Sequence, residues 1–138
     1  MRQYIGTKII EAEPMSRGQG GKAEDGYKVR YPDGYESWSP KDVFEEAYRP
    51  TDCMSFGLAI EAMKKGKKVA RRGWNGKNQH IELATRISYM TADGVFVNVE
   101  HEAIGNKAIA FCGTSGVQMG WLASQADMLA DDWQIVEA

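Results

Sequence analysis

Cysteine and histidine are scarce in this chain of 138 residues, which has 2 of each. Cys53 and Cys112 are far apart and form no CxxC pair, so we expect neither a disulfide framework nor a zinc site and interpret both as reduced packing residues. His80 and His101 have no carboxylate at helical metal-ligand spacing and no Ser, Cys or Asp beside them in a motif typical of a catalytic triad. The sequence therefore predicts no metal, no cofactor and no catalytic residue.

The chain also lacks a charge excess of either sign and a long apolar segment. It has 17 basic and 19 acidic residues, so it offers no broad cationic surface of the kind that nucleic-acid binding requires. No apolar run approaches the roughly 18 residues of a membrane span, and residues 1–8 lack the apolar core of a signal peptide. We expect a cytoplasmic protein that binds neither nucleic acid nor membranes.

Residues 1–50 have the pattern of a small α+β module. Strand-like composition or alternation occurs in three segments, 4–10, 26–31 and 35–38, and the last two flank a Pro-Asp-Gly turn as a hairpin does. Ser39 as N-cap and Pro40 in the first turn predict a helix through about Tyr48. The glycine-rich segment 16–22 lacks the Lys-Ser or Lys-Thr ending of a phosphate-binding loop, so a flexible turn is the better interpretation. Residues 49–52 mark the expected domain boundary.

Residues 54–138 are predicted to form a second α+β module. Ser55 is a candidate N-cap for an amphipathic helix that closes at Gly66. A short helix is expected at 125–130, and strands are expected at 67–72, 80–84, 87–91, 95–99, 107–112, 117–122 and 133–136. Because strands outnumber helices and their connections are short, we predict an α+β fold with a small antiparallel sheet rather than a doubly wound one.

Three aromatic residues stand where a ligand could reach them. Trp74 lies in a Gly-Trp-Asn-Gly turn, Trp121 precedes a predicted cap, and Phe56 begins the first helix of the second module. Each could instead belong to the core, because aromatic side chains dominate cores whatever the function. Loop positions nevertheless display side chains at clefts, where flat rings stack on a purine base.

Polar residues near these rings complete a candidate ligand site. Arg71 and Arg72 are adjacent on a predicted strand and point to opposite faces, so the inward one could hold a pyrophosphate. Asn75 could approach a phosphate or ribose in the glycine-flanked turn. In Ser124-Gln125-Ala-Asp127, the serine can cap a helix while the aspartate returns to the backbone N–H of the serine. Gln125 is then left at the helix N-terminus, and Asp127 could either cap or bind ribose hydroxyls.

Taken together, these motifs resemble the phage family of Thoeris anti-defence protein 2. The resemblance covers about residues 54–136 and rests on Phe56, the Arg-Arg-Gly-Trp-Asn-Gly segment at 71–76 and the segment 121–127. It implies a homotetramer that binds and sequesters glycocyclic ADP-ribose, and in some members cyclic dinucleotides, without degrading them. The pockets would lie at subunit interfaces and would be lined by Phe56, Arg71, Arg72, Trp74, Asn75, Trp121, Ser124, Gln125 and Asp127.

Two departures and two alternatives accompany this resemblance. Residues 1–50 are additional to the family, and residues 95–120 intervene between the Ala-Asp-Gly hairpin and the Trp-Leu-Ala-Ser-Gln segment, which are nearly continuous in shorter relatives. One alternative is a structural or protein-binding phage accessory module that uses the tyrosine-rich hairpin 26–38 as its contact surface. The other is a nucleotide-modifying enzyme, which would need a catalytic group that the sequence does not advertise.

Overall fold

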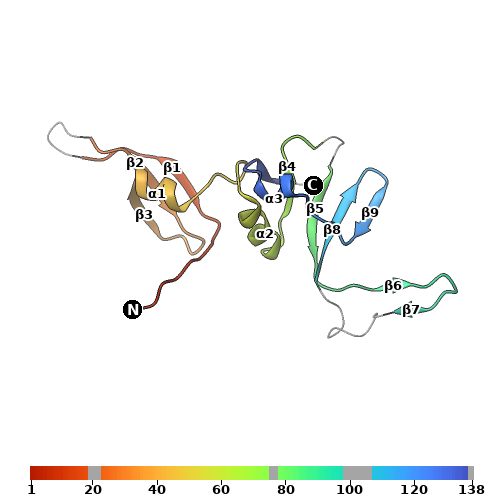
Figure 1. The fold of residues 1–138 in the computed structure, drawn as a ribbon. Coiled ribbons are helices and arrows are strands. Elements are labelled where there is room, and N and C mark those ends of the chain that lie inside the picture. The colour runs from red at the N-terminus through yellow and green to blue at the C-terminus, as the bar shows by residue number, and fades with distance from the viewer. Residues whose placement is uncertain (19–22, 75–77, 98–106, 137–138) are drawn as a thin grey trace. The chain divides into compact units, whose positions relative to one another are not determined.

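The computed structural model describes residues 1–18, 23–74, 78–97 and 107–136 (Figure 1). Contacts divide the chain into two compact units, Met1–Arg49 and Pro50–Ala138. The predicted α+β class is confirmed, since the strand pairs of the described residues are antiparallel and the helices are short. No helix in the described part of the chain is long and apolar enough to span a membrane.

The N-terminal unit is a three-stranded sheet with one helix. The strands follow in the order β1-β2-β3, and α1 comes directly after them; their bounds are β1 (Glu11–Pro14), β2 (Gly26–Arg30), β3 (Glu36–Pro40) and α1 (Lys41–Ala47). Tyr27 on β2 stacks on Phe44 of α1 with ring centroids 4.1 Å apart, and its hydroxyl donates to Glu45 over 2.8 Å. Val29 is buried. The predicted hairpin of β2 and β3 is confirmed.

Two details of the N-terminal unit correct the sequence analysis. The strand predicted at 4–10 is wrong, because β1 lies at 11–14, where it pairs with β2 and the backbone N–H of Met15 extends the pairing to the Gly26 carbonyl. The predicted Ser39 cap is also wrong. Ser39 is still paired with Tyr27 in the sheet, and the cap position falls on Pro40, which has no side-chain oxygen to offer.

The C-terminal unit is built on a five-stranded antiparallel sheet of order β10-β4-β5-β8-β9. The elements are α2 (Phe56–Lys64), β4 (Lys68–Arg71), β5 (His80–Ala84), β8 (Ala108–Gly113), β9 (Gly116–Met119), α3 (Gln125–Leu129) and β10 (Trp133–Val136). A separate hairpin joins β6 (Tyr89–Met90) to β7 (Phe96–Val97). In Figure 1 this hairpin extends away from the larger sheet.

Helix α2 supplies the core of this unit. The Ser55 hydroxyl accepts a hydrogen bond from the backbone of Leu58, as the sequence predicts, and Gly66 has a φ of +87°, which suits a residue after a helix C-terminus. The buried face of α2 packs against Val69 and Ile81, both 0% exposed, on the central strands. One face of the sheet is therefore covered by α2 and forms the apolar core.

The remaining strand predictions hold to different degrees. Strands 80–84 and 133–136 are confirmed at their predicted bounds, whereas the segment predicted at 87–91 contributes only the short β6. Residues 98 and 99 of the strand predicted at 95–99 lie outside the described residues. The strand predicted at 117–122 ends at Met119, because Gly120 has a φ of +86° and the backbone N–H groups of Gly120 and Trp121 both turn to the carbonyl of Ile109.

Candidate ligand-binding site

Five aromatic rings, each from or beside a different helix or strand of the C-terminal unit, meet around Trp133. This aromatic cluster consists of Phe56, Trp74, Phe111, Trp121 and Trp133. Trp133 is 0% exposed, and its ring centroid lies 5.2 Å from that of Phe56, 5.5 Å from Trp74 and 6.2 Å from Trp121. The other four rings are half-buried. The structure thus brings together the three aromatic residues that the sequence analysis selected. They pack around Trp133, which the sequence analysis did not select.

Trp133 is fixed by its backbone as well as by its ring. Its N–H and C=O exchange hydrogen bonds with Met54, at 3.0 and 2.7 Å, and its β10 register partner is Arg71 on β4. The indole N–H donates to the carbonyl of Asp127 over 2.9 Å. A buried indole needs such a partner, because an unsatisfied N–H would cost on the order of 1–3 kcal/mol. The hydrogen bond therefore offsets the desolvation cost of the indole N–H and allows Trp133 to be completely buried.

The three predicted aromatic residues reach Trp133 from element ends. Phe56 is the first residue of α2, Trp74 follows β4 and donates its backbone N–H to the carbonyl of Arg71, and Trp121 follows β9. Most of the rings meet edge to face; for example, Trp74 and Trp121 are 5.9 Å apart at an interplanar angle of 64°. The outer rings thus contact the core and also keep a partly exposed surface. Core packing and ligand stacking, the two interpretations weighed from the sequence, are therefore compatible for the same side chains.

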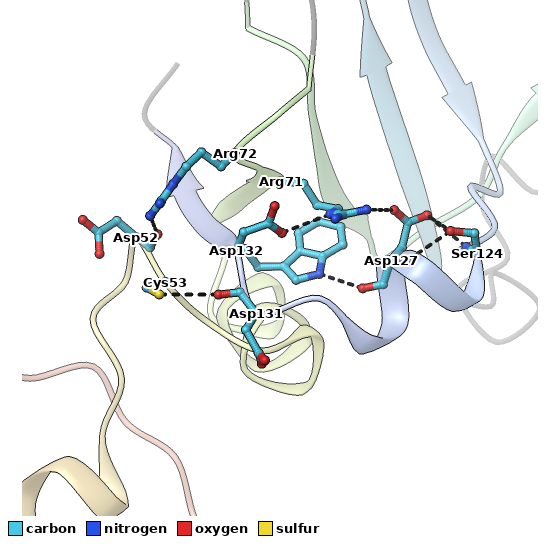
Figure 2. A network of polar contacts seen from close by, with 9 residues as sticks. Asp52, Cys53, Arg71, Arg72, Ser124, Asp127, Asp131 and Asp132 are labelled. Carbon is cyan, nitrogen blue, oxygen red and sulfur yellow. Dashed lines mark hydrogen bonds and ion pairs between the residues drawn. The ribbon is translucent and has the colours of Figure 1, made fainter.

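A network of charged groups ties α3 to the sheet beside the cluster (Figure 2). The guanidinium of Arg71 donates to Asp127 and to Asp132, each over 3.0 Å. The second carboxylate oxygen of Asp127 accepts from the backbone N–H and the hydroxyl of Ser124, at 2.9 and 2.8 Å. The hydroxyl of Ser124 in turn accepts from the Asp127 backbone. The predicted capping box is confirmed.

This network sets the ionisation of its members. Burial alone would raise the pKa of Asp127, but hydrogen bonds from Ser124 and the ion pair with Arg71 outweigh burial, so the pKa is lowered overall. The hydrogen bonds that Arg71 donates to Asp132 and then to Asp127 raise the pKa of Arg71. Arg71 and Asp127 are therefore both charged at neutral pH. Since two carboxylates already hold Arg71, the idea that the inward arginine binds a pyrophosphate does not fit this arrangement.

The other predicted polar residues lie around this network. Arg72 is exposed, and one nitrogen of its guanidinium donates to the backbone carbonyl of Asp52 over 2.8 Å. Gln125 is the exposed first residue of α3, a helix of only 5 residues. Asn75 lies outside the described residues. Among the predicted cations and amides that the structure describes, Arg72 and Gln125 are therefore the ones exposed to solvent.

Several residues of consequence escaped the sequence analysis. The sequence analysis assigns no role at the site to Trp133, Phe111 or Asp132. The tryptophan at each end of the segment 121–133 could have indicated that Trp133 belongs to the aromatic group. His80 also has neighbours that the search for helical metal-ligand spacing did not consider. On β5 and β8, His80 is the register partner of Cys112, and Glu82 is two residues further along the same strand. Only helical spacing was considered, whereas strand spacing brings these three side chains together.

The network predicts a pH-dependent contribution of Asp127 to stability. Asp127→Ala removes the capping bonds and one ion pair, so we expect a loss of about 2 kcal/mol in the free energy of unfolding at pH 7. Because the folded-state pKa is depressed, this contribution is complete above the unfolded pKa of about 4 and is lost as pH falls through the folded pKa. Urea unfolding from pH 7 to pH 2.5 measures it, with the exposed neighbour Asp131→Ala as control. Equal losses in both variants, or a loss independent of pH, would contradict the network.

Comparisons with known proteins match the part of the chain that contains the aromatic cluster and the Arg71 network. Residues 54–136 match the family of Thoeris anti-defense 2-like domains. A curated relative, Thoeris anti-defense 2 of Bacillus phage SP01, is 40% identical over 88 residues, a match that covers 60% of this chain and 94% of the relative. The family match includes every member of the aromatic cluster and the Arg71 network, and it leaves residues 1–53 outside. The chain therefore belongs to the Thoeris anti-defense 2-like family.

Proposed function

We propose that this protein is a phage anti-defence protein that binds a cyclic nucleotide immune signal, glycocyclic ADP-ribose, and sequesters it without cleaving it. Family membership supports the anti-defence role. The observation that carries the binding proposal is the convergence of Phe56, Trp74 and Trp121 on one buried ring, with each left half-exposed. Flat, half-exposed rings on rigid supports suit stacking on a base, which contributes roughly 1–3 kcal/mol per base.

In this proposal some polar residues support the site and others contact the ligand. Ser124 and Asp127 are hydrogen-bonded to each other, and Asp127 is paired with Arg71, so these residues hold α3 against the sheet. Gln125 is exposed and would meet the ligand with its amide on hydroxyl groups, whereas the guanidinium of Arg72 turns to the Asp52 carbonyl. This division needs no general base.

The polar chemistry of the described residues also favours binding over catalysis. Catalytic cysteines work as thiolates and have a lowered pKa. The cysteine that lies near a histidine here is Cys112, and burial, followed by its hydrogen bond to Glu82, raises its pKa. Its thiol therefore lacks the activation that a nucleophile requires, which supports a sequestering protein rather than a nucleotide-modifying enzyme.

We also propose that the protein works as a homotetramer with pockets shared between subunits. The C-terminal unit is small for enclosing a nucleotide, and symmetric interfaces would supply further walls. Exposed apolar side chains are available for such contacts on the β6–β7 hairpin and on edge strand β9: Tyr89, Met90, Val95, Phe96, Val117 and Met119. Exposed apolar groups of this kind are typical of interaction surfaces.

Recovery of the ligand tests the proposed function directly. Protein in excess over glycocyclic ADP-ribose should retain the compound through gel filtration and release it unchanged on heat denaturation, as identified by chromatography and mass. A cyclic dinucleotide run in parallel tests the second ligand class. Steady appearance of a cleaved or modified product over many turnovers would show an enzyme instead. Failure to retain any of these compounds would favour the accessory-module alternative.

Replacement of one ring tests where the ligand lies. Trp74→Leu keeps apolar volume in the cluster but removes a flat ring, so we expect ligand binding to weaken by roughly 1–3 kcal/mol with the fold retained. Calorimetric titration measures the first quantity and circular dichroism the second. Trp38→Leu, on β3 of the N-terminal unit, is the matched control and should bind as the parent does. Equal affinity of the Trp74 variant and the parent would move the site away from the cluster.

The oligomer proposal predicts the mass in solution. Light scattering during gel filtration at micromolar concentration should give four times the chain mass of 15.4 kDa. Val117→Lys on the exposed edge strand places a charge in the proposed contact surface and should lower the mass, whereas Lys64→Glu on α2 should not. A monomeric parent protein would rule out pockets built between subunits.

A further inference from the structure

A histidine, a carboxylate and a thiol meet on two neighbouring strands of the large sheet. His80 on β5 pairs directly with Cys112 on β8, and Glu82 lies two residues beyond His80, so all three project from the same face. One ligand-type atom from each lies within 4.8 Å of the others. The Cys112 sulfur is 3.2 Å from one Glu82 oxygen, and His80 Nε2 is 4.0 Å from the other.

This group is separate from the aromatic cluster. Ile81, which lies between His80 and Glu82, belongs to the core under α2, as does Phe111 beside Cys112. Since side chains alternate across a strand, the three residues point to the opposite face of the sheet from the core. A ligand here would not compete directly with one stacked on the aromatic rings.

His80 carries the strongest indication of a ligand. It is 7% exposed, and its Nδ1 lies 2.7 Å from the backbone carbonyl of Asn78. A carbonyl only accepts hydrogen bonds, so Nδ1 holds a proton, and the neutral form of the ring presents a lone pair on Nε2. That Nε2 is buried and has no hydrogen-bond partner among the described residues. A buried acceptor without a partner is costly, and a metal-bound histidine usually donates its other ring N–H to a carbonyl or carboxylate in this way.

We infer that His80, Glu82 and Cys112 form a binding site for a thiophilic divalent metal ion of the zinc type. A thiolate, an imidazole nitrogen and a carboxylate select Zn²⁺ or its analogue Co²⁺ over Mg²⁺ and Ca²⁺, which prefer all-oxygen sites. With metal–nitrogen and metal–sulfur bonds of about 2.0 and 2.3 Å, tetrahedral ligand atoms lie roughly 3.5 Å apart. The separations of 3.2 and 4.0 Å bracket that value, so small side-chain rotations complete the site.

Metal binding would replace the existing thiol contact. Cys112 now donates its proton to Glu82. On binding, the sulfur–hydrogen bond breaks, the proton leaves to solvent, and the sulfur and the Glu82 carboxylate both coordinate the ion. His80 enters as the neutral ligand that its hydrogen bond to Asn78 already prepares. Three protein ligands leave a fourth position for water or another donor, as in open zinc sites.

Cobalt and zinc titrations of the full chain test this inference. Chelator-treated protein should bind one Co²⁺ per chain at micromolar concentration and develop a thiolate-to-cobalt charge-transfer band with intense tetrahedral d–d bands. Zn²⁺ should displace the cobalt stoichiometrically. Cys112→Ser should abolish the charge-transfer band, and Glu82→Gln and His80→Gln should each weaken Zn²⁺ binding more than tenfold.

The control is the other cysteine. Cys53 is exposed and lies outside the three-residue group, so Cys53→Ser should keep the cobalt spectrum and the zinc affinity of the parent. Circular dichroism checks each fold, and Cys112→Ser and Glu82→Gln change so little volume that they decide the matter if the His80 variant unfolds. Absence of saturable binding, an unchanged spectrum in Cys112→Ser, or loss of the spectrum in Cys53→Ser would overturn the site. Retention of nucleotide does not enter this test, so it fails or succeeds independently of the proposed function.

Discussion

The complete burial of Trp133 is the constraint on which the C-terminal unit depends. A ring of that size with a polar N–H can be 0% exposed only because the Asp127 carbonyl accepts its hydrogen bond. Asp127 is in turn held by the Ser124 cap and by Arg71. A five-residue helix has little stability of its own, so the cap and the ion pair keep α3 against the sheet. The sequence of β10 thereby determines the position of a helix and of three further rings.

This dependence divides the side chains of the site into two kinds. Arg71 and Asp127, charged groups of the types used in phosphate binding and catalysis, are paired with each other. In the proposed function, the surface left for a ligand consists of the aromatic rings together with Gln125. Such a surface would bind a nucleotide through stacking and a few polar contacts. Rigid supports also favour slow dissociation, which a sequestering protein needs.

Local patterns predicted the fold well and the site only in part. Capping chemistry at Ser55 and Ser124, and the strands at 80–84 and 133–136, follow from neighbours in sequence and are confirmed. Strand partners depend on residues far apart, so the segment 4–10 was mistaken for a strand and Ser39 for a cap. The same limit hid the pairing of His80 with Cys112 and the engagement of Arg71 by Asp132. Loop and helix-end positions made it possible to predict Phe56, Trp74 and Trp121. Their common contact with Trp133 could not be predicted, because it depends on the order of strands in the sheet.

Nuclear magnetic resonance of the tryptophan indole groups tests the central claim most directly, because each of the 4 tryptophans gives its own N–H signal. On addition of glycocyclic ADP-ribose, the signals of Trp74 and Trp121 should shift strongly. Trp133, buried and hydrogen-bonded, should shift little and keep slow hydrogen exchange, and Trp38 should not move. Shifts confined to Trp38, or none at saturating ligand, would contradict a site on the aromatic cluster.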